Sequence, residues 1–194
     1  MKTPTAHGNM SKPKVLVFAG PNGSGKSTIS KLIPHYGVYI NADELKKEYA
    51  LTDIEAAQKA EALRNRLVDK KADFTFETVL STKRNLLLLK RAKENNYEVH
   101  CIYVLTCNAD INIARVRSRV FEGGHDVPEE KIQSRYVKAL KLLPQIIEIC
   151  DKIYIYDNSI MPSILFKKDS NGSDYFPTDI WPLKKLKELL KQGL

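Results

Sequence analysis

The chain has 194 residues, of which 43% are hydrophobic, and a formal net charge of +8. This length is typical of one domain, and the hydrophobic content suffices for one packed core. No stretch approaches the roughly 20 consecutive apolar residues of a transmembrane helix, and no basic start leads into an apolar segment with a cleavage site. We therefore expect a cytoplasmic protein with no membrane partner, made of a flexible leader or tag at 1–13 and a single domain at 14–194.

The excess of basic residues has two interpretations. A basic patch attracts phosphates, so nucleic acid is one candidate partner. A solvated surface together with an anion-binding pocket explains the same charge. We favour the second interpretation, because many lysines lie at 183–191, in the pattern of an ordinary amphipathic helix.

The three cysteines, Cys101, Cys107 and Cys150, lie in or beside apolar segments. An odd number of cysteines in this setting fits buried reduced thiols better than a disulfide framework or a zinc site. This favours a reducing cytosol.

Five segments are predicted to be strands of a parallel sheet. The first is almost wholly apolar and ends at a glycine-rich loop, as a central strand does. Segments of helical pattern alternate with the strands, which implies a sheet covered by helices on both faces. The expected strands are residues 15–19, 37–40, 74–78, 98–105 and 152–156.

The expected helices carry recognisable start signals. Thr52 and Glu55 have the spacing of a capping box before a run rich in Ala and Leu. Ser81 and Asn108 are expected to cap two further helices, and Pro128 is expected to start another. The expected helical segments include residues 26–33, 52–70, 86–92, 113–120, 132–143 and 183–191.

A glycine-rich loop follows the first strand and opens a helix. Its glycines let successive backbone N–H groups face phosphate oxygens without side-chain clashes. Lys26 is placed to reach the β- and γ-phosphates, and Ser27 to ligate Mg²⁺. A turn that merely joins strand to helix is the alternative, but the strand and helix context favours ATP with Mg²⁺. The expected ATP-binding residues are Gly20, Pro21, Asn22, Gly23, Ser24, Gly25, Lys26, Ser27 and Thr28.

This loop predicts the fold class. We expect an α/β P-loop NTPase three-layer fold with a five-stranded parallel sheet, a kinase-type lid, and a C-terminal hairpin plus helix. The hairpin is expected where residues 164–167 and 174–176 flank Asn171 and Gly172. The sequence lacks the Asn-Lys-x-Asp loop of guanine-specific GTPases and the Ser-Gly-Gly signature of transport ATPases. Chiefly the kinase branch remains.

A kinase must also position an acceptor hydroxyl and take its proton. Asp43 lies just beyond the second strand, where open α/β sheets bind ligands, and is our candidate base. Glu44 is its rival, and a first-turn carboxylate stabilised by the helix dipole is the structural alternative. Glu77 and Thr78 end the third strand at the same edge. We expect them to hold acceptor hydroxyls or a magnesium-bound water rather than only to form a turn.

Three arginines flank a glycine pair on two predicted helices. This arrangement suits a lid that closes charged donors over phosphates, with solvated helix arginines as the alternative. We expect the lid at about 115–135, with Arg115 and Arg119 facing away from the core, and with Arg115, Arg119 and Arg135 acting in catalysis. His125 either contacts the ligand or caps the hinge.

Taken in order, these segments resemble the zeta toxin family of P-loop kinases, in particular its compact stand-alone branch. The resemblance extends over about residues 15–159. Its pieces are the phosphate loop, Asn41-Ala42-Asp43-Glu44, Phe76-Glu77-Thr78, residues 115–120, residues 123–128 with Arg135, and Tyr156-Asp157-Asn158-Ser159.

The resemblance implies transfer of the ATP γ-phosphate to a hydroxyl of an amino-sugar nucleotide such as UDP-N-acetylglucosamine. Asp43 then matches the base of the family, and the segment with Glu77 and Thr78 matches its acceptor-binding segment, although Glu-Thr-Val-Leu-Ser differs from the spacing of the toxins. An antitoxin protein is a further candidate partner. The residues that match the family's charge-neutralising groups are Lys26, Arg119 and Arg135, and those that complete the expected acceptor side are Asn41, Glu44 and His125.

Two other functions stay open at this point. One is a kinase that acts on another metabolite or on nucleic-acid ends, which the charge of +8 keeps in view. The other is a nucleotide-dependent binding switch that hydrolyses ATP slowly and signals through a partner.

Overall fold

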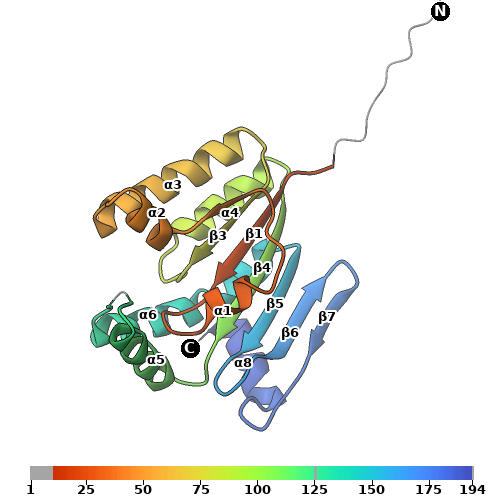
Figure 1. Ribbon diagram of the computed structural model, residues 1–194. Coiled ribbons are helices and arrows are strands. Elements are labelled where there is room, and N and C mark those ends of the chain that lie inside the picture. The colour runs from red at the N-terminus through yellow and green to blue at the C-terminus, as the bar shows by residue number, and fades with distance from the viewer. Residues whose placement is uncertain (1–10, 125, 194) are drawn as a thin grey trace, which may run out of the picture.

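The structure, a computed structural model, describes residues 11–124 and 126–193. Its strands are β1 (Lys14–Ala19), β2 (Val38–Ile40), β3 (Phe74–Thr78), β4 (Glu98–Leu105), β5 (Lys152–Asp157), β6 (Ser163–Asp169) and β7 (Gly172–Tyr175). They form one mixed sheet in the order β2-β3-β1-β4-β5-β6-β7. Figure 1 shows this order from β3 to β7. The first five strands in that order are parallel, and β6 and β7 are antiparallel.

The predicted fold class is confirmed, with seven strands in place of five. All five predicted parallel strands are present, in the α/β arrangement of P-loop proteins. The predicted hairpin joins the same sheet, since β6 pairs with β5 and β7 pairs with β6. In the hairpin turn, the backbone N–H of Asn171 donates to Asp169 Oδ1 at 2.8 Å. The extra strands therefore extend the sheet rather than cover it.

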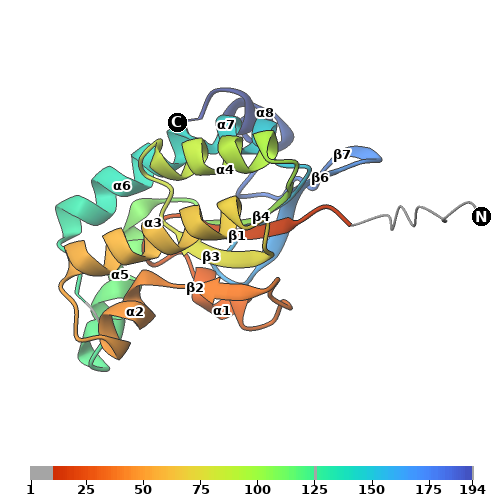
Figure 2. The ribbon, with the colours of Figure 1, turned by 90° about the horizontal axis from the view of Figure 1, so that it is seen from above.

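Helices cover the two faces of the sheet unequally. They are α1 (Lys26–Ser30), α2 (Ala42–Glu48), α3 (Asp53–Asp69), α4 (Arg84–Glu94), α5 (Ala109–Phe121), α6 (Glu129–Lys141), α7 (Leu143–Ile149) and α8 (Leu183–Gln192). Figure 2 shows α3, α4, α7 and α8 on one face of the sheet and the short α1 on the other.

The central strand β1 explains this layering. Its residues are buried on both faces of the sheet, which is why the segment is apolar without alternation. Val15 and Val17 belong to the large core under α3, α4, α7 and α8. Leu16 and Phe18 point the other way and pack with Ile29 of α1. The strand is thereby fixed between two layers, and the loop that follows it is held at the sheet edge.

Two of the predicted helix caps are present. Thr52 and Glu55 form the predicted capping box, because Thr52 Oγ1 accepts from the Glu55 backbone and Glu55 Oε2 accepts from the Thr52 backbone. Asn108 Oδ1 accepts from the backbone N–H of Ile111 at 3.1 Å. Local sequence was sufficient for both caps.

The third predicted cap, Ser81, is wrong. Helix α4 begins at Arg84, and its N-cap residue Lys83 makes no capping hydrogen bond with its side chain. After β3 the chain turns, and Thr78 Oγ1 accepts from the backbone of Leu80 at 3.0 Å. This turn moves the start of the helix past Ser81.

Other helix boundaries also differ from the prediction. The helix expected at 26–33 ends at Ser30, since Pro34 disfavours a helical conformation in the residues just before it. The helical segment expected at 132–143 is divided, because α6 ends at Lys141 and α7 begins at Leu143 with a proline in its first turn. Helix α2, directly after β2, was not predicted as an element.

All three cysteines are free, as predicted. Cys101 and Cys150 are buried, and Cys107 is half-buried. Burial raises the pKa of the Cys101 thiol, and the neighbouring Cys150 adds to this shift. These thiols therefore behave as small apolar side chains of the core.

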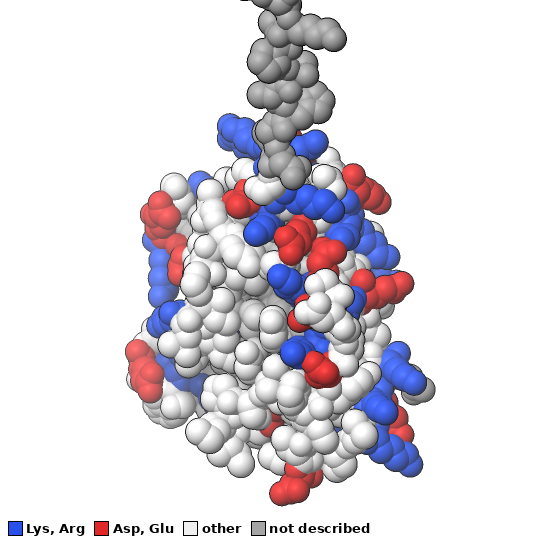
Figure 3. Space-filling view, turned by 90° about the vertical axis from the view of Figure 1, so that its right-hand side faces the viewer, with Lys and Arg blue, Asp and Glu red and all other residues white. Residues whose placement is uncertain are grey.

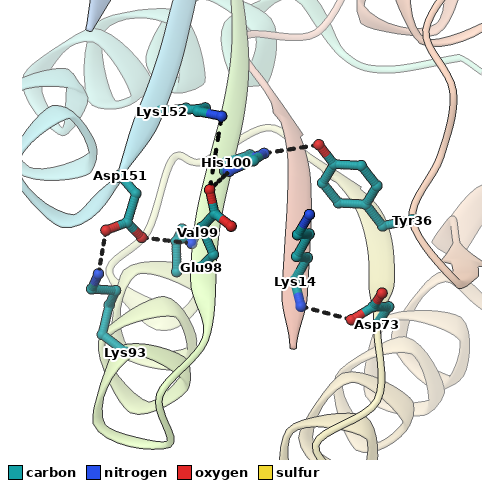
Figure 4. Close-up of polar contacts among 9 residues, drawn as sticks. All are labelled: Lys14, Tyr36, Asp73, Lys93, Glu98, Val99, His100, Asp151 and Lys152. Carbon is teal, nitrogen blue, oxygen red and sulfur yellow. Dashed lines mark hydrogen bonds and ion pairs between the residues drawn. The ribbon is translucent and has the colours of Figure 1, made fainter. Parts of the chain in front are cut away.

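A polar network joins the amino ends of the strands, as Figure 4 shows. His100 on β4 lies between Tyr36, whose hydroxyl is 2.9 Å from Nδ1, and Glu98, whose Oε1 is 2.7 Å from Nε2. Lys152 of β5 lies 3.9 Å from the same carboxylate. The hydrogen bond from His100 lowers the pKa of Glu98. Since the strands are parallel, this network lies at the opposite end of the sheet from the glycine-rich loop.

Charged side chains are unevenly spread over the face shown in Figure 3. Lys and Arg, interspersed with Asp and Glu, lie over its upper part and its right-hand side as far as the centre, and a wide uncharged area extends over the left-central and lower part. This face therefore offers no continuous basic track for a nucleic-acid backbone. Within residues 11–124 and 126–193, none of the helices combines the length and the hydrophobicity that crossing a bilayer requires.

Candidate active site

A cleft of about 640 Å³ opens at the carboxyl ends of the parallel strands. The glycine-rich loop between β1 and α1 contributes to it, with α2 and α3 on one side and α5 and α6 on the other (Figure 1). Most of the predicted site residues meet here. Those that line the cleft are Asn22, Gly23, Gly25, Lys26, Ser27, Thr28, Asn41, Asp43, Glu77, Thr78, Arg115, Arg119 and Arg135.

The remaining predicted residues do not form the cleft wall. Gly20, Pro21 and Ser24 are buried within the loop. Glu44 is exposed on α2 and is not among the residues that line the cleft. His125 lies outside the described residues.

The loop requires glycine at two close contacts. Gly20 has a φ of +140°, and a Cβ there would lie 2.0 Å from the carbonyl oxygen of Val104 on β4. Gly25 has a φ of +94°, and a Cβ added there would lie 2.2 Å from Asn158 Nδ2. Both positions combine a left-handed backbone with no room for a side chain. The loop therefore packs tightly against β4 and against the segment that follows β5.

Two asparagine side chains fix the outer part of this loop. Asn112 of α5 donates from Nδ2 to the carbonyl oxygen of Asn22 at 2.6 Å and accepts from Thr106 Oγ1. Asn158, after β5, donates from Nδ2 to the carbonyl oxygen of Ser24 at 2.8 Å. Sequence reasoning missed the role of Asn112, although a polar residue four positions before the buried Val116 is a signal that could have found it.

Lys26 lies in the cleft at the start of α1. Its ammonium donates to the carbonyl oxygens of Gly20 at 2.8 Å and Pro21 at 2.9 Å. Burial lowers its pKa to about 8, and the nearby carboxylates of Glu77 and Asp43 oppose this shift. The cation is thus held within reach of the loop and close to two acidic side chains.

Ser27 and Glu77 form a pair of oxygen ligands beside Lys26. Ser27 Oγ donates to Glu77 Oε2 at 3.0 Å, and the hydroxyl of Tyr39 on β2 donates to Glu77 Oε1 at 2.7 Å. A hydroxyl and a carboxylate fit Mg²⁺, which takes one or two protein ligands together with nucleotide phosphates. In the described part of the chain no group of three or more His, Cys, Asp or Glu side chains lies together to hold a metal by itself.

Tyr39 was missed by sequence reasoning. Its hydroxyl also accepts from Asn41 Nδ2 at 3.2 Å, so Tyr39 links the end of β2 to Glu77 at the end of β3. Burial raises the pKa of Tyr39 to about 12, which keeps the hydroxyl protonated as a donor. Aromatic residues are common in strands, so the sequence alone gave no reason to single it out.

Asp43 reaches the cleft from the first turn of α2. Asn41 caps this helix, since its Oδ1 accepts from the backbone N–H of Asp43 at 2.9 Å. The Asp43 carboxylate lines the cleft, whereas that of Glu44 does not. Geometry therefore distinguishes the two rival carboxylates in favour of Asp43.

Thr78 has a clear structural role. Its hydroxyl oxygen accepts from the backbone of Leu80 at 3.0 Å and from Asn85 Nδ2 at 2.7 Å. These bonds build the turn after β3 and fix the start of α4. Thr78 also lines the cleft, so an acceptor would meet it as part of a rigid wall.

The lid helices bring three arginines to the cleft. Arg135 Nη1 donates to Asn22 Oδ1 at 3.4 Å, across to the phosphate loop. Arg115 was expected to point away from the core, but it is half-buried, and its Nη2 donates to the carbonyl oxygen of Ser159 at 3.2 Å. Its Nη1 is buried without a hydrogen-bond partner among the described residues. Arg119 lines the same cleft from the last turn of α5.

Two contacts hold the lid helices together. Arg117 Nε donates to Glu129 Oε1 at 2.6 Å, which links α5 to α6. Beneath it, Val116, Val127 and Ile132 form a small apolar cluster of their own. This cluster is separate from the main cores, whereas Tyr136 and Leu140 farther along α6 belong to the largest core and anchor that helix to the sheet.

Comparison with known proteins identifies the family of this chain. The sequence model of the zeta toxin family matches residues 2–169, a range that includes every strand and helix around the cleft. The chain belongs to the zeta toxin family. It is therefore a P-loop phosphotransferase of the kinase type.

A relative of this zeta toxin family member occurs in Haemophilus influenzae (strain ATCC 51907 / DSM 11121 / KW20 / Rd). That uncharacterized protein is 33% identical over 129 residues, which cover 63% of this chain and 92% of the relative. The shared segment is thus nearly the whole of the relative.

Solved structures share the fold of this zeta toxin family member. A chain of the AvrRxo1-ORF1:AvrRxo1-ORF2 complex with sulphate ions has a TM-score of 0.72 at 13% identity, covering 94% of this chain. This chain spans 65% of the length of that protein. A protein of the PezAT toxin-antitoxin system of Streptococcus pneumoniae has a TM-score of 0.58 at 19% identity, covering 92% of this chain and 78% of its own. At identities of 13% and 19%, these matches show a similar fold and nothing more specific.

Because the pKa of Lys26 is lowered, the affinity of this zeta toxin family member for ATP is expected to depend on pH. Bound phosphates favour the charged ammonium, so above pH 8 the binding of Mg-ATP is expected to take up a proton at Lys26 and to weaken as the pH rises. Calorimetry at about pH 8.5, in two buffers of different ionisation enthalpy, measures this uptake. The uptake should be lost in Lys26→Met.

The lowered pKa of Lys26 also affects the stability of the folded protein. Because the folded-state pKa lies below the ordinary value of 10.5, folding favours the neutral amine, and the charged Lys26 costs stability at neutral pH. Lys26→Met should unfold at a higher temperature than the wild type near pH 7. The difference should shrink as the pH rises from 8 to 10.5. Equal proton uptake in wild type and variant would contradict this account.

Proposed function

We propose that this protein transfers the γ-phosphoryl group of ATP to a hydroxyl of an amino-sugar nucleotide of the UDP-N-acetylglucosamine type. The observation that carries this proposal is the presence of a second wall of the cleft, with the Asp43 carboxylate on it, opposite the phosphate loop. A switch that only hydrolyses ATP needs the loop, whereas a kinase also needs a place for an acceptor. Asp43 provides such a place in the same cleft as Lys26.

Asp43 is the proposed general base. Its carboxylate is exposed to the cleft and lies near enough to Lys26 to influence the pKa of that ammonium. An acceptor hydroxyl between the two would give its proton to Asp43 as its oxygen attacks the γ-phosphorus, and the β–γ bridging oxygen would leave with ADP. Asn41 and Glu77, on either side, are proposed to orient the acceptor.

The positive charge required in the transition state comes from Lys26 and the lid. Arg119 is close enough to Lys26 to lower its pKa, and Arg135 reaches the loop at Asn22. We propose that Arg119 and Arg135 bind the transferring phosphoryl group. Arg115 would then hold the nucleotide beside Ser159.

Ser27 and Glu77 are the proposed holders of Mg²⁺. The metal would neutralise charge on the β- and γ-phosphates when bound with ATP. Ser27 would contribute its hydroxyl, and Glu77 would accept hydrogen bonds from the water around the metal. Glu77 is anchored by Tyr39 for this purpose.

A protein partner is also proposed. The PezAT structure is described as that of a toxin-antitoxin system, and AvrRxo1-ORF1 is described as a complex with AvrRxo1-ORF2. By family membership, an antitoxin is the candidate partner of this chain. The domain bounds of 14–194 and the acceptor roles of Glu44 and His125 stay predictions.

Removing the lid arginines tests their catalytic role. Arg119→Ala and Arg135→Ala should each lower the rate of transfer by about 10²- to 10³-fold, because each removes a donor aimed at the developing charge. Lys138→Ala is the matched control, since Lys138 is an exposed cation on α6, the helix of Arg135, and does not line the cleft. Steady-state rates of ADP formation with acceptor give the comparison. Rates that fall equally in all three variants would point to loss of lid structure instead.

The acceptor class is tested by a screen. Purified protein with Mg-ATP is incubated with nucleotide sugars, nucleosides and oligonucleotides, and phosphate release and mass shifts are recorded. Addition of one phosphoryl group to UDP-N-acetylglucosamine supports the proposal. Phosphorylation of oligonucleotide ends alone would favour a nucleic-acid kinase, and phosphate release with no modified acceptor would favour the binding switch.

A further inference from the structure

Arg64 is an arginine in the buried stripe of a helix. On α3 the buried side chains recur every four residues, at Ala56, Ala60, Arg64 and Val68. Only 7% of Arg64 is exposed, and its guanidinium lies over the ring of Phe76, 5.1 Å from the ring centroid. A buried charge destabilises the fold unless it is paired. An arginine at this position of the stripe therefore indicates a role other than packing.

Among the residues that the structure describes, no carboxylate forms a hydrogen bond or an ion pair with Arg64, although the charge of Glu61 acts on it from nearby. Its Nε is buried and makes no hydrogen bond with any residue in the described part of the chain. Two other cations on this wall are paired, since Lys46 Nζ lies 2.6 Å from Asp53 Oδ1 and Arg84 Nη1 lies 3.2 Å from Glu61 Oε2. Burial lowers the pKa of Arg64 to about 10, so the guanidinium stays charged at neutral pH.

Arg64 forms part of the cleft wall on the side of α3. The small side chains Ala56, Ala57 and Ala60 line the cleft beside it and leave space along the helix. Asp43 lines the same cleft from α2. A substrate whose hydroxyl meets Asp43 could therefore extend along α3 as far as Arg64.

We propose that Arg64 binds a phosphate group carried by the acceptor. The planar guanidinium binds phosphate through two parallel hydrogen bonds, which suits a fixed, buried arginine. Glu61 on the same helix attracts Arg64 electrostatically, but its carboxylate is paired with Arg84 at 3.2 Å, so an acceptor phosphate would be the anion bonded to Arg64 itself. Because the P-loop serves the phosphates of ATP, this subsite serves the second substrate. The inference rests on the proposed function and adds to it the group that recognises the acceptor.

The test uses the full-length protein saturated with Mg²⁺ and a non-hydrolysable ATP analogue, so that the P-loop cannot take the probe. UDP, UMP and uridine are titrated into wild type, Arg64→Met and Arg64→Lys by calorimetry. We expect wild type to bind UDP, and to bind uridine about thirtyfold more weakly or worse. Arg64→Met should lose affinity for UDP by a similar factor. Arg64→Lys should fall between the two, since it keeps the charge without the planar fork.

Arg66→Met is the matched control, because Arg66 is an exposed arginine on the same helix and does not line the cleft. It should bind UDP as wild type does. Arg64→Met should also melt at a higher temperature than wild type, because it removes a buried charge.

Four results would each overturn the proposal: unchanged UDP binding in Arg64→Met, equal binding of UDP and uridine by wild type, no binding of UDP, or a lower melting temperature for Arg64→Met. Phosphoryl transfer is not measured in this experiment. Failure to phosphorylate UDP-N-acetylglucosamine would therefore be a separate result, which concerns the proposed function alone.

Discussion

Asp43→Asn is expected to lose about 10²- to 10⁴-fold in the rate of phosphoryl transfer while Mg-ATP affinity stays near that of the wild type. Asparagine fills the same space at the first turn of α2 but cannot take the proton of the acceptor hydroxyl. The loop that holds the nucleotide is built by β1, α1 and the two asparagines that fix it, so it does not depend on Asp43. Single-turnover rates and nucleotide titrations measure the two properties separately.

Glu44→Gln is the matched control for this substitution. Glu44 is the adjacent carboxylate on the same helix turn, but it does not line the cleft. Its loss should leave transfer within about threefold of wild type, as for most surface substitutions. If Glu44→Gln lost activity and Asp43→Asn kept it, the assignment of the base would be reversed.

Gly20→Ala is expected to destabilise the whole protein by about 3 kcal/mol, a sum of backbone strain and overpacking. A Cβ at this position would lie 2.0 Å from the carbonyl oxygen of Val104, a backbone atom of the central sheet that cannot move aside cheaply. The phosphate loop would then be displaced, and ATP binding should be lost with it. Denaturant unfolding gives the free-energy change, and nucleotide titration gives the loss of binding.

Gly172→Ala separates the two contributions to that effect. Gly172 has a φ of +128°, similar to the +140° of Gly20, but a Cβ there would meet nothing within 4 Å. This variant should therefore show only the cost of backbone strain, about 1 kcal/mol, and normal ATP binding. Equal destabilisation by the two substitutions would mean that the contact with β4 has no energetic weight.

The features predicted correctly from sequence are those that local patterns determine. The phosphate loop, the five parallel strands and the caps at Thr52 and Asn108 each depend on residues close together in the chain. The doubly buried β1 gave an uninterrupted apolar run, which distinguishes a central parallel strand from an edge strand. The order of the strands in the sheet could not be predicted from local patterns, because it depends on how the connecting helices pack against the sheet.

The features that sequence could not supply arise from contacts distant in the chain. Asn112 bonds the carbonyl oxygen of Asn22 from a helix ninety residues later. Its position four residues before Val116 indicates a polar side chain on a buried face, but the sequence does not indicate which group it contacts. In the sequence, Tyr39 is an ordinary strand residue. Only the fold places Glu77 within hydrogen-bond distance of its hydroxyl. The wrong cap at Ser81 has the same cause, because the turn after β3 redirects the chain before the helix begins.

Arg64 shows how structure changes the meaning of a residue. In the sequence it is one arginine among many on a basic chain, and solvation is the ordinary expectation. Its place in the stripe with Ala60 and Val68 could have been noticed, since an arginine at that spacing interrupts a buried face. Only the fold shows that this face opens into the cleft.

The donor and acceptor sides of the cleft are held by different parts of the fold. The loop is packed against β4 and α5, whereas Asp43 and Arg64 belong to α2 and α3 on the opposite wall. The lid arginines lie on α5 and α6, which also pack together through the apolar cluster of Val116, Val127 and Ile132. The charges proposed to act on the phosphates and the carboxylate proposed as base are therefore carried by different helices.

The most direct test of the central claim follows the γ-phosphoryl group itself. ATP labelled in that group is incubated with Mg²⁺, the protein and UDP-N-acetylglucosamine, and the label is partitioned between acceptor and free phosphate. We predict that the label appears on the sugar nucleotide as one added phosphoryl group, and that this transfer is lost in Asp43→Asn. Label found only as free phosphate, at the same rate with and without acceptor, would contradict a kinase that uses both walls of this cleft.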